Sequence, residues 1–167
     1  MFLTKINKMF LCISLVLCSF VYTQDVEIGF GAVDADAGTM ELTMNTPYDV
    51  GGFQFDILGT TLGTASGGLA ADAGFTVSTG GSTILGFSFS GTFIPAGSSG
   101  VLTIVNFTAD DLEACLDMGT GAISDTSGGA LPVVLDDCVM LGEVVEGCTD
   151  DTACNYDENA NTDDGSC

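Results

Sequence analysis

The sequence predicts an all-β fold, a β-sandwich followed by a small disulfide-rich C-terminal tail. Short apolar segments are separated by Gly, Ser, Thr and Asp, and no apolar period extends over the length of a helix. Turn segments such as "DADAG", "STGGS" and "IPAGSSG" recur at the spacing of a sandwich. The last 21 residues hold three cysteines and six carboxylates, which sets the tail apart from the domain before it.

Eight segments are expected to be strands, and their alternation indicates which face is buried. In "TMELTMN" the two methionines and the leucine share one face, and in "GFQFDI" the two phenylalanines and the isoleucine do the same. "GVLTIVNF" is apolar on both faces, as expected of a central strand that is covered on both sides. Only "TADDLEACL" has a pattern that allows a helical turn, with Thr108 or Asp110 as its cap. The expected strands are 26–30, 39–45, 51–57, 74–79, 83–90, 100–107, 121–124 and 131–135.

Residues 1–24 are expected to be a secretory signal peptide. A short basic start with Lys5 and Lys8 is followed by the apolar run "MFLCISLVLCSFVY", which is too short to span a bilayer securely. An uncleaved anchor is disfavoured because no basic residues follow the run, and a lipoprotein site at Cys18 is disfavoured by the bulky Leu17. We therefore expect a secreted or cell-surface protein without stable membrane insertion after cleavage.

The charge of the chain after residue 24 is entirely acidic. Lys5 and Lys8 are the only basic side chains of the whole sequence, and both lie before residue 25. Residues 25–167 therefore contain no Lys, Arg or His, and they carry all 23 Asp and Glu residues. Nucleic acid and anionic membranes are excluded as partners, since binding phosphate requires Lys or Arg. Without those side chains there is no Ser-His pair, no Schiff base and no phosphate clamp. A glycosidase-type carboxylate pair is disfavoured because the chain has no Trp to stack a sugar, so we expect no enzyme.

Three segments resemble a cohesin-type domain. They are "PYDVGGFQFDI", "ILGFSFSGTFIPAGSSGVLTIVNFTA" and "ISDTSGGALPVVL", and the resemblance extends over most of residues 26–142. It implies a cohesin-like jelly-roll sandwich that acts as a non-catalytic binding or adhesion module in extracellular assembly. The implied partner is a dockerin-like or surface protein. The alternative is a carbohydrate-binding module for a polysaccharide, because the fold is related to carbohydrate-binding sandwiches.

Five cysteines follow the signal peptide, and in an exported protein they are expected to be oxidised or bound to metal. We expect Cys115 to pair with Cys138, since zinc is disfavoured by the spacing and by the absence of His. In the tail, Cys167 is expected to pair with Cys154 or with Cys148. The third tail cysteine would then be free or would link to another chain.

The tail "GCTDDTACNYDENANTDDGSC" is similar to a short repeat that occurs in tandem at the C-termini of secreted marine bacterial and viral proteins. It is rich in small oxygen ligands, which suit Ca²⁺. A segment this small has almost no apolar core and needs additional stabilisation. The alternative is a solvated acidic tail that is held by its disulfides and has no specific site. The expected calcium ligands are Asp157, Asn159, Asn161, Asp163 and Asp164.

Three regions are therefore expected: a signal peptide at 1–24, a cohesin-like sandwich at 25–145, and a Cys- and Asp-rich repeat at 146–167 that binds calcium. The aromatic side chains of the sandwich are expected to fill its core instead of forming a ligand platform. This expectation covers Phe53, Phe55, Phe87 and Phe89.

Overall fold

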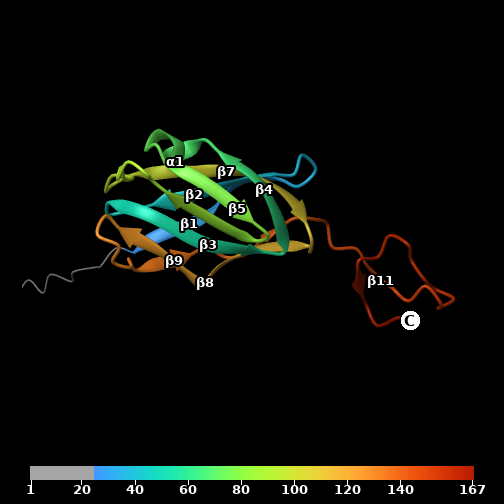
Figure 1. Ribbon diagram of the computed structural model, residues 1–167. Helices are drawn as coiled ribbons and strands as arrows, with labels where there is room; N and C mark the ends of the chain where they lie inside the picture. The colour runs from blue at the N-terminus through green and yellow to red at the C-terminus, as the bar shows by residue number, and fades with distance from the viewer. Residues whose placement is uncertain (1–24) are drawn as a thin grey trace, which may run out of the picture.

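The computed structural model describes residues 25–167, which form two five-stranded sheets packed face to face, with a small tail beyond one end (Figure 1). The first sheet has the strand order β4-β7-β2-β1-β9 and the second has the order β10-β8-β3-β6-β5. The expected signal peptide lies outside the described residues. Within residues 25–167, no helix is long and apolar enough to cross a membrane.

The elements follow one another along the chain with short connections. In the first sheet the strands are β1 (Val26–Asp34), β2 (Thr39–Asn45), β4 (Thr60–Ser66), β7 (Ser99–Ala109) and β9 (Val133–Leu135). In the second sheet they are β3 (Val50–Leu58), β5 (Thr76–Gly80), β6 (Thr83–Phe87), β8 (Glu113–Asp125) and β10 (Val139–Met140). One short helix, α1 (Gly68–Asp72), joins β4 to β5, and the tail contains β11 (Glu146–Gly147) and β12 (Thr162–Asp163). Most pairs are antiparallel, but β1 pairs with β9 in parallel, as does β11 with β12.

The core lies between the two sheets and follows the alternation of the strands. The expected inward side chains of β2 and β3 are all buried, including Met40, Phe53 and Ile57. Gly86 of β6 is buried beneath the Phe53 ring, and a Cβ at this position would collide with that ring. The sequence "ILGF" thus leaves a space in β6 that the aromatic ring of the neighbouring strand fills.

Four local predictions differ from the structure. A helix, α1, forms in the Gly- and Ala-rich segment Gly68–Asp72, where the sequence predicts none. Residues 108–116 form no helical turn, because the N–H groups of Asp110 and Asp111 both bond to the Gly59 carbonyl and the chain turns directly into β8. β4 was not expected, since only one large apolar side chain, Leu62, marks its inward face. β7 is not covered on both faces along its length, because Ile104 is 41% exposed.

The tail is a compact unit built on backbone hydrogen bonds to residues 143–148. The N–H groups of Asn161 and Thr162 bond to the Val145 carbonyl, and the N–H of Asp157 bonds to the carbonyl of Cys148, whose side chain is buried. In Figure 1 this unit lies beyond the end of the sandwich that is far from α1. The proposed boundary between 145 and 146 stays a prediction.

Candidate functional site

The outer face of the second sheet contains a patch without any charged side chain. The strand register aligns two rows of outward positions across β5, β6, β3 and β8. The outward positions alternate with buried ones such as Phe53 and Ile84, which fixes their direction. We call this patch the uncharged face, and it consists of Thr76, Phe87, Gly52 and Ser124 in one row and Ser78, Leu85, Gln54 and Ala122 in the other.

A shallow hollow of about 370 Å³ lies in the uncharged face. Gly52 and Gly121 contribute only backbone to its lining, whereas Leu85 and Phe87 contribute large apolar side chains. Leu85, in the second strand from the sheet edge, is 37% exposed. The hollow gives a complementary surface a place to dock, and it is too open to sequester a reaction from water.

The outer face of the first sheet is different in charge. It carries Glu27 and Glu41, and the Asp136 carboxylate lies over Gly29 on the same face. Two of the carboxylates are held by hydrogen bonds: Glu41 accepts from the N–H of Ala32 at 3.2 Å, and Glu27 accepts from the side-chain amide of Asn45 at 2.9 Å. In residues 25–167 about one residue in six is acidic, so the absence of charged side chains from the uncharged face distinguishes this patch from the outer face of the first sheet.

Two carboxylates border the uncharged face. Asp56 of β3 lies directly opposite Asp117 of β8, and like charges in this position destabilise a sheet. Asp56 accepts a hydrogen bond from the Thr83 hydroxyl, and Asp117 accepts one from the N–H of Gly119 at 3.1 Å. Residues 25–167 contain no Lys or Arg that could neutralise the pair.

An exposed aromatic side chain lies next to the opposite border. Phe89 is 85% exposed and packs edge to face against Phe87, with the ring centroids 4.7 Å apart. The expectation of core aromatics is correct for Phe53 and Phe55, which are buried, and wrong for Phe87, which points outward from β6, and for Phe89. β6 ends at Phe87, and Phe89 lies in the turn that follows. A large apolar residue just beyond the end of a strand is the sequence feature that could have indicated an exposed ring.

The turn around Phe89 is fixed by one serine. Ser88 Oγ accepts hydrogen bonds from the N–H groups of Ser90 at 3.3 Å and Thr92 at 3.1 Å. The Thr92 hydroxyl lies 2.7 Å from Ser88 Oγ and donates to the carbonyl of Ala73 at 2.6 Å. The exposed ring is thus presented by an ordered loop, which lowers the entropy cost of any contact it makes.

The cysteines pair in the way that the sequence favours for the sandwich. Cys115 and Cys138 form a disulfide between β8 and the segment leading into β10, and Cys148 pairs with Cys167 in the tail. Of the two alternatives for Cys167, the structure has the pairing with Cys148, and Cys154 is a free, exposed thiol.

The expected calcium ligands Asp157, Asp163 and Asp164 accept hydrogen bonds within local turns of the tail. Asp157 Oδ1 accepts from both nitrogens of Asn159, at 3.0 and 3.1 Å, and Asp163 accepts from the N–H of Gly165 at 2.9 Å. Asp164 accepts from the N–H of Ser166 at 2.8 Å. Each oxygen is thus part of a local turn.

Asn161 has a structural role that the sequence did not predict. Its side chain accepts from the N–H of Val145 at 2.9 Å and donates to the carbonyl of Glu143 at 2.7 Å.

The described residues contain one cluster of three possible metal ligands. In residues 25–167, three Asp, Glu or Cys ligand atoms lie within 4.8 Å of one another only at Glu113, Cys115 and Cys138, and both sulfurs there belong to a disulfide. Calcium binding by the tail stays a prediction.

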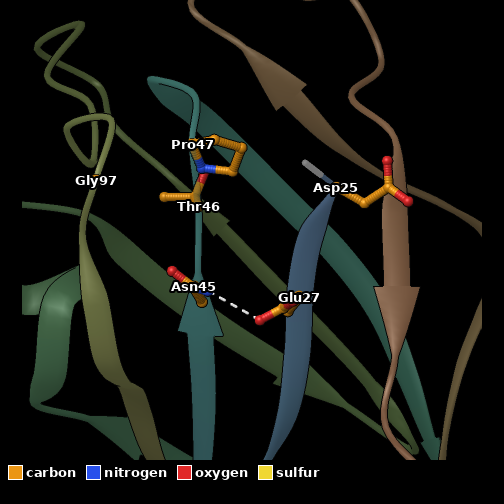
Figure 2. Close-up of a pocket in the computed structure, with 6 residues that line it drawn as sticks. All are labelled: Asp25, Glu27, Asn45, Thr46, Pro47 and Gly97. Carbon is orange, nitrogen blue, oxygen red and sulfur yellow. Dashed lines mark hydrogen bonds between the residues drawn. The ribbon is translucent and has the colours of Figure 1, made fainter. Parts of the chain in front are cut away.

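An acidic recess lies where β1 begins, and Figure 2 shows the residues that line it. Asp25 directly precedes β1 and Glu27 lies in β1, whereas Asn45, Thr46 and Pro47 come from the end of β2 and the residues after it. Glu27 turns toward Asn45, whereas the Asp25 carboxylate points away from both. The two carboxylates therefore do not converge on a common point.

Three exposed carboxylates are stabilised in their charged form by hydrogen bonds. The N–H groups of Gly129 and then Ser127 hold the pKa of Asp125 below its ordinary value. The hydroxyl and the N–H of Thr152 lower the pKa of Asp150 in the same way. The hydroxyl and the N–H of Ser166 lower the pKa of Asp164. These groups fix turns.

No protein-family model and no curated protein matches the sequence. Solved structures do match it. The sixth cohesin of scaffoldin B from Acetivibrio cellulolyticus, in complex with a dockerin, has a TM-score of 0.52 at 12% identity, covering 71% of this chain and 100% of that one. CaCohA2 of Clostridium acetobutylicum, also in a complex, has a TM-score of 0.51 at 15% identity, covering 70% of this chain and 99% of that one. The two-sheet jelly-roll sandwich of this chain is a cohesin-like fold.

Proposed function

We propose that this protein is a non-catalytic module for extracellular assembly, which binds a protein partner through the uncharged face. The observation that carries the proposal is a patch of eight outward residues without charge on a chain that is otherwise strongly acidic. Protein–protein interfaces are depleted in charge at their centre and have a polar rim. The uncharged face has this arrangement, with the apolar side chains of Leu85 and Phe87 on β6, an inner strand of the sheet, and the Asp56–Asp117 pair at its border.

The proposed partner is dockerin-like. Support comes from the cohesin-like fold, since one of the similar cohesins is in complex with a dockerin. The partner's contact surface would be apolar in its centre, to cover Leu85, and would present Lys or Arg toward Asp56 and Asp117. An opposite charge at this place removes the repulsion between the two carboxylates, which favours the bound state.

The module is proposed to be secreted and stabilised by calcium. The disulfides support an oxidising compartment, where they persist. Calcium binding by the tail is supported by the crowding of carboxylates there without any basic side chain. The absence of Lys, Arg and His from residues 25–167 supports a non-catalytic role, because most acid–base and nucleophilic mechanisms require one of these side chains.

Polysaccharide binding is a second candidate, and one observation favours it. Phe89 offers an exposed ring, and a small polar recess lined by Ser88, Thr92, Ser124 and Asp125 lies beside it. A sugar ring that stacks on Phe89 would find hydroxyl and carboxylate partners in this recess.

The two candidates can be separated by cross-linking. A photo-reactive amino acid in place of Leu85 should cross-link to one protein among those secreted by the source cells, or to a purified dockerin. The matched control places the same group at Ile104, which is 41% exposed at the outer face of the other sheet, and should give no such product. Equal cross-linked products from both positions would contradict the protein-docking proposal. It would also be contradicted if Leu85 gave no product and the protein instead bound a polysaccharide in a way that required Phe89.

A further inference from the structure

A second hollow, apart from the uncharged face, lies between α1 and the loop that connects β6 to β7. Leu69 and Ala73 form one wall, and Phe93, Ile94 and Pro95 form the other. The hollow encloses about 420 Å³, and Phe93 is 41% exposed on its border. We call it the α1 groove. Its lining is mostly apolar, which distinguishes it from the small polar recesses elsewhere on the described residues.

Hydrogen bonds fix both walls of the α1 groove. The Thr92 hydroxyl donates to the Ala73 carbonyl at 2.6 Å and so joins the loop to the end of α1. Ile94 exchanges two backbone hydrogen bonds of 2.9 Å with Val50, and the N–H of Ser98 bonds to the Pro95 carbonyl at 3.1 Å. The groove is therefore preformed, and an occupant would not have to order it.

Charge decides what this groove can accept. Asp72 is the one ionisable side chain in its lining, and it is exposed on α1. A second copy of this chain is a poor occupant, because residues 25–167 carry 23 acids and no Lys or Arg, so two copies repel each other. An anionic lipid surface is repelled for the same reason, and a sugar would leave most of its hydroxyls facing apolar side chains.

We propose that the α1 groove binds a cationic peptide segment of another protein, with one large apolar side chain inserted between Leu69 and Phe93 and a flanking Lys or Arg paired with Asp72. The acidic field of the whole chain raises the rate at which such a segment arrives, and the apolar walls select its central side chain. This site is independent of the uncharged face and goes beyond the docking function that is proposed for that face.

The test is an NMR titration of the ¹⁵N-labelled chain 25–167 with three synthetic peptides, Lys-Phe-Lys, Lys-Ser-Lys and Glu-Phe-Glu, each with blocked ends. Lys-Phe-Lys should cause saturable shifts of the amides of Leu69, Ala73 and Phe93, and the other two peptides should not. Equal shifts with Lys-Ser-Lys would show general attraction to an acidic surface, and that result would overturn the proposal. The absence of saturable shifts in the groove would overturn it too.

Variants locate the binding. Phe93→Ser should weaken the affinity about tenfold, since about 1.4 kcal/mol of apolar contact corresponds to that factor. Asp72→Asn should weaken it about threefold at low salt, as expected for one exposed ion pair. The matched control is Phe89→Ser in the same loop, which removes a more exposed ring outside the groove and should leave the affinity unchanged.

Two further measurements keep the test decisive. If Phe93→Ser alters the amide spectrum throughout the sandwich, Pro95→Ser replaces it, because Pro95 is exposed and its carbonyl contact is retained. An equal loss of affinity in Phe89→Ser and in the groove variant would place the peptide on the loop surface and would overturn the proposal. Neither groove variant should change cross-linking from Leu85, so this site and the uncharged face can fail separately.

Discussion

Leu85 of β6 lies directly opposite Gln54 of β3, and both side chains point out of the sandwich. Their neighbours along the strands, Ile84 and Phe53, point inward and are buried. The same alternation that builds the core therefore also sets an apolar and an amide side chain side by side at the surface. This pair lies in the row of the uncharged face that is next to the Asp56–Asp117 pair.

The inward side of β6 can be tested at Gly86. Gly86→Ala should destabilise the protein by about 1–3 kcal/mol, because the new methyl group collides with the Phe53 ring in a packed core. Gly80→Ala is the matched control, since a Cβ at Gly80 meets no atom within 4 Å, and it should stay within about 0.5 kcal/mol of the wild type. Urea unfolding of both variants measures the difference, and equal stability would show that Phe53 does not require this space.

The sandwich should fold without the tail. A chain that ends at Gly142 keeps all ten strands of the two sheets, the Cys115–Cys138 disulfide and the buried Leu141. It should unfold in one cooperative transition with β-type circular dichroism, whereas replacing Cys115 and Cys138 with Ala should cost about 3 kcal/mol. A truncated chain without a cooperative transition would mean that the tail completes the core.

Calcium should stabilise the tail by more than screening. The tail carboxylates lie close together in sequence without a basic partner, and a divalent ion would offset their repulsion. Calcium should therefore slow proteolysis within residues 148–167 more than sodium chloride of the same ionic strength, and magnesium should be weaker. Replacing Asp157 and Asp163 with Asn should remove most of the difference. Equal protection by both salts would identify a solvated tail without a site.

Acid should loosen the turn at Asp125. The hydrogen bonds from Gly129 and Ser127 lower the folded-state pKa of this carboxyl below its ordinary value of 3.8. A lowered pKa means that the stabilisation is present above the unfolded-state value and is lost as the pH falls through the folded-state value. The protection of the N–H groups of Ser127 and Gly129 against hydrogen exchange, relative to an unstructured chain at the same pH, should therefore fall only below about pH 4. Asp125→Asn keeps an oxygen acceptor and should remove this pH dependence. Titration of Asp125 above 3.8 would contradict the prediction.

Much of the sandwich could be predicted because alternation and packing agree there. The residues of β2 coincide with the predicted segment, and its expected inward side chains are buried. β4 could not be predicted, since its hydrogen bonds to β7 stabilise a segment of small and polar residues. The turn before β8 could not be predicted, because its structure depends on hydrogen bonds to Gly59, which is distant in sequence.

The candidate site could be predicted only in part. The uncharged face requires the strand order, which brings together residues from four separate segments, and no single segment contains that signal. Asn161 looked like a metal ligand because its residue type fits, but its amide spans to Glu143 and Val145. A local pattern could not indicate those contacts, since Glu143 is 18 residues and Val145 is 16 residues away in the sequence.

The most direct test of docking through the uncharged face compares Leu85→Asp with Ile104→Asp. The two residues have similar exposure on the outer faces of opposite sheets, and both variants add one negative charge. Isothermal titration calorimetry with the partner captured at Leu85 should show a loss of at least about 2 kcal/mol, roughly thirtyfold in affinity, for Leu85→Asp. Ile104→Asp should bind like the wild type. Equal binding by both variants, or a loss that occurs only in Ile104→Asp, would contradict docking through this face.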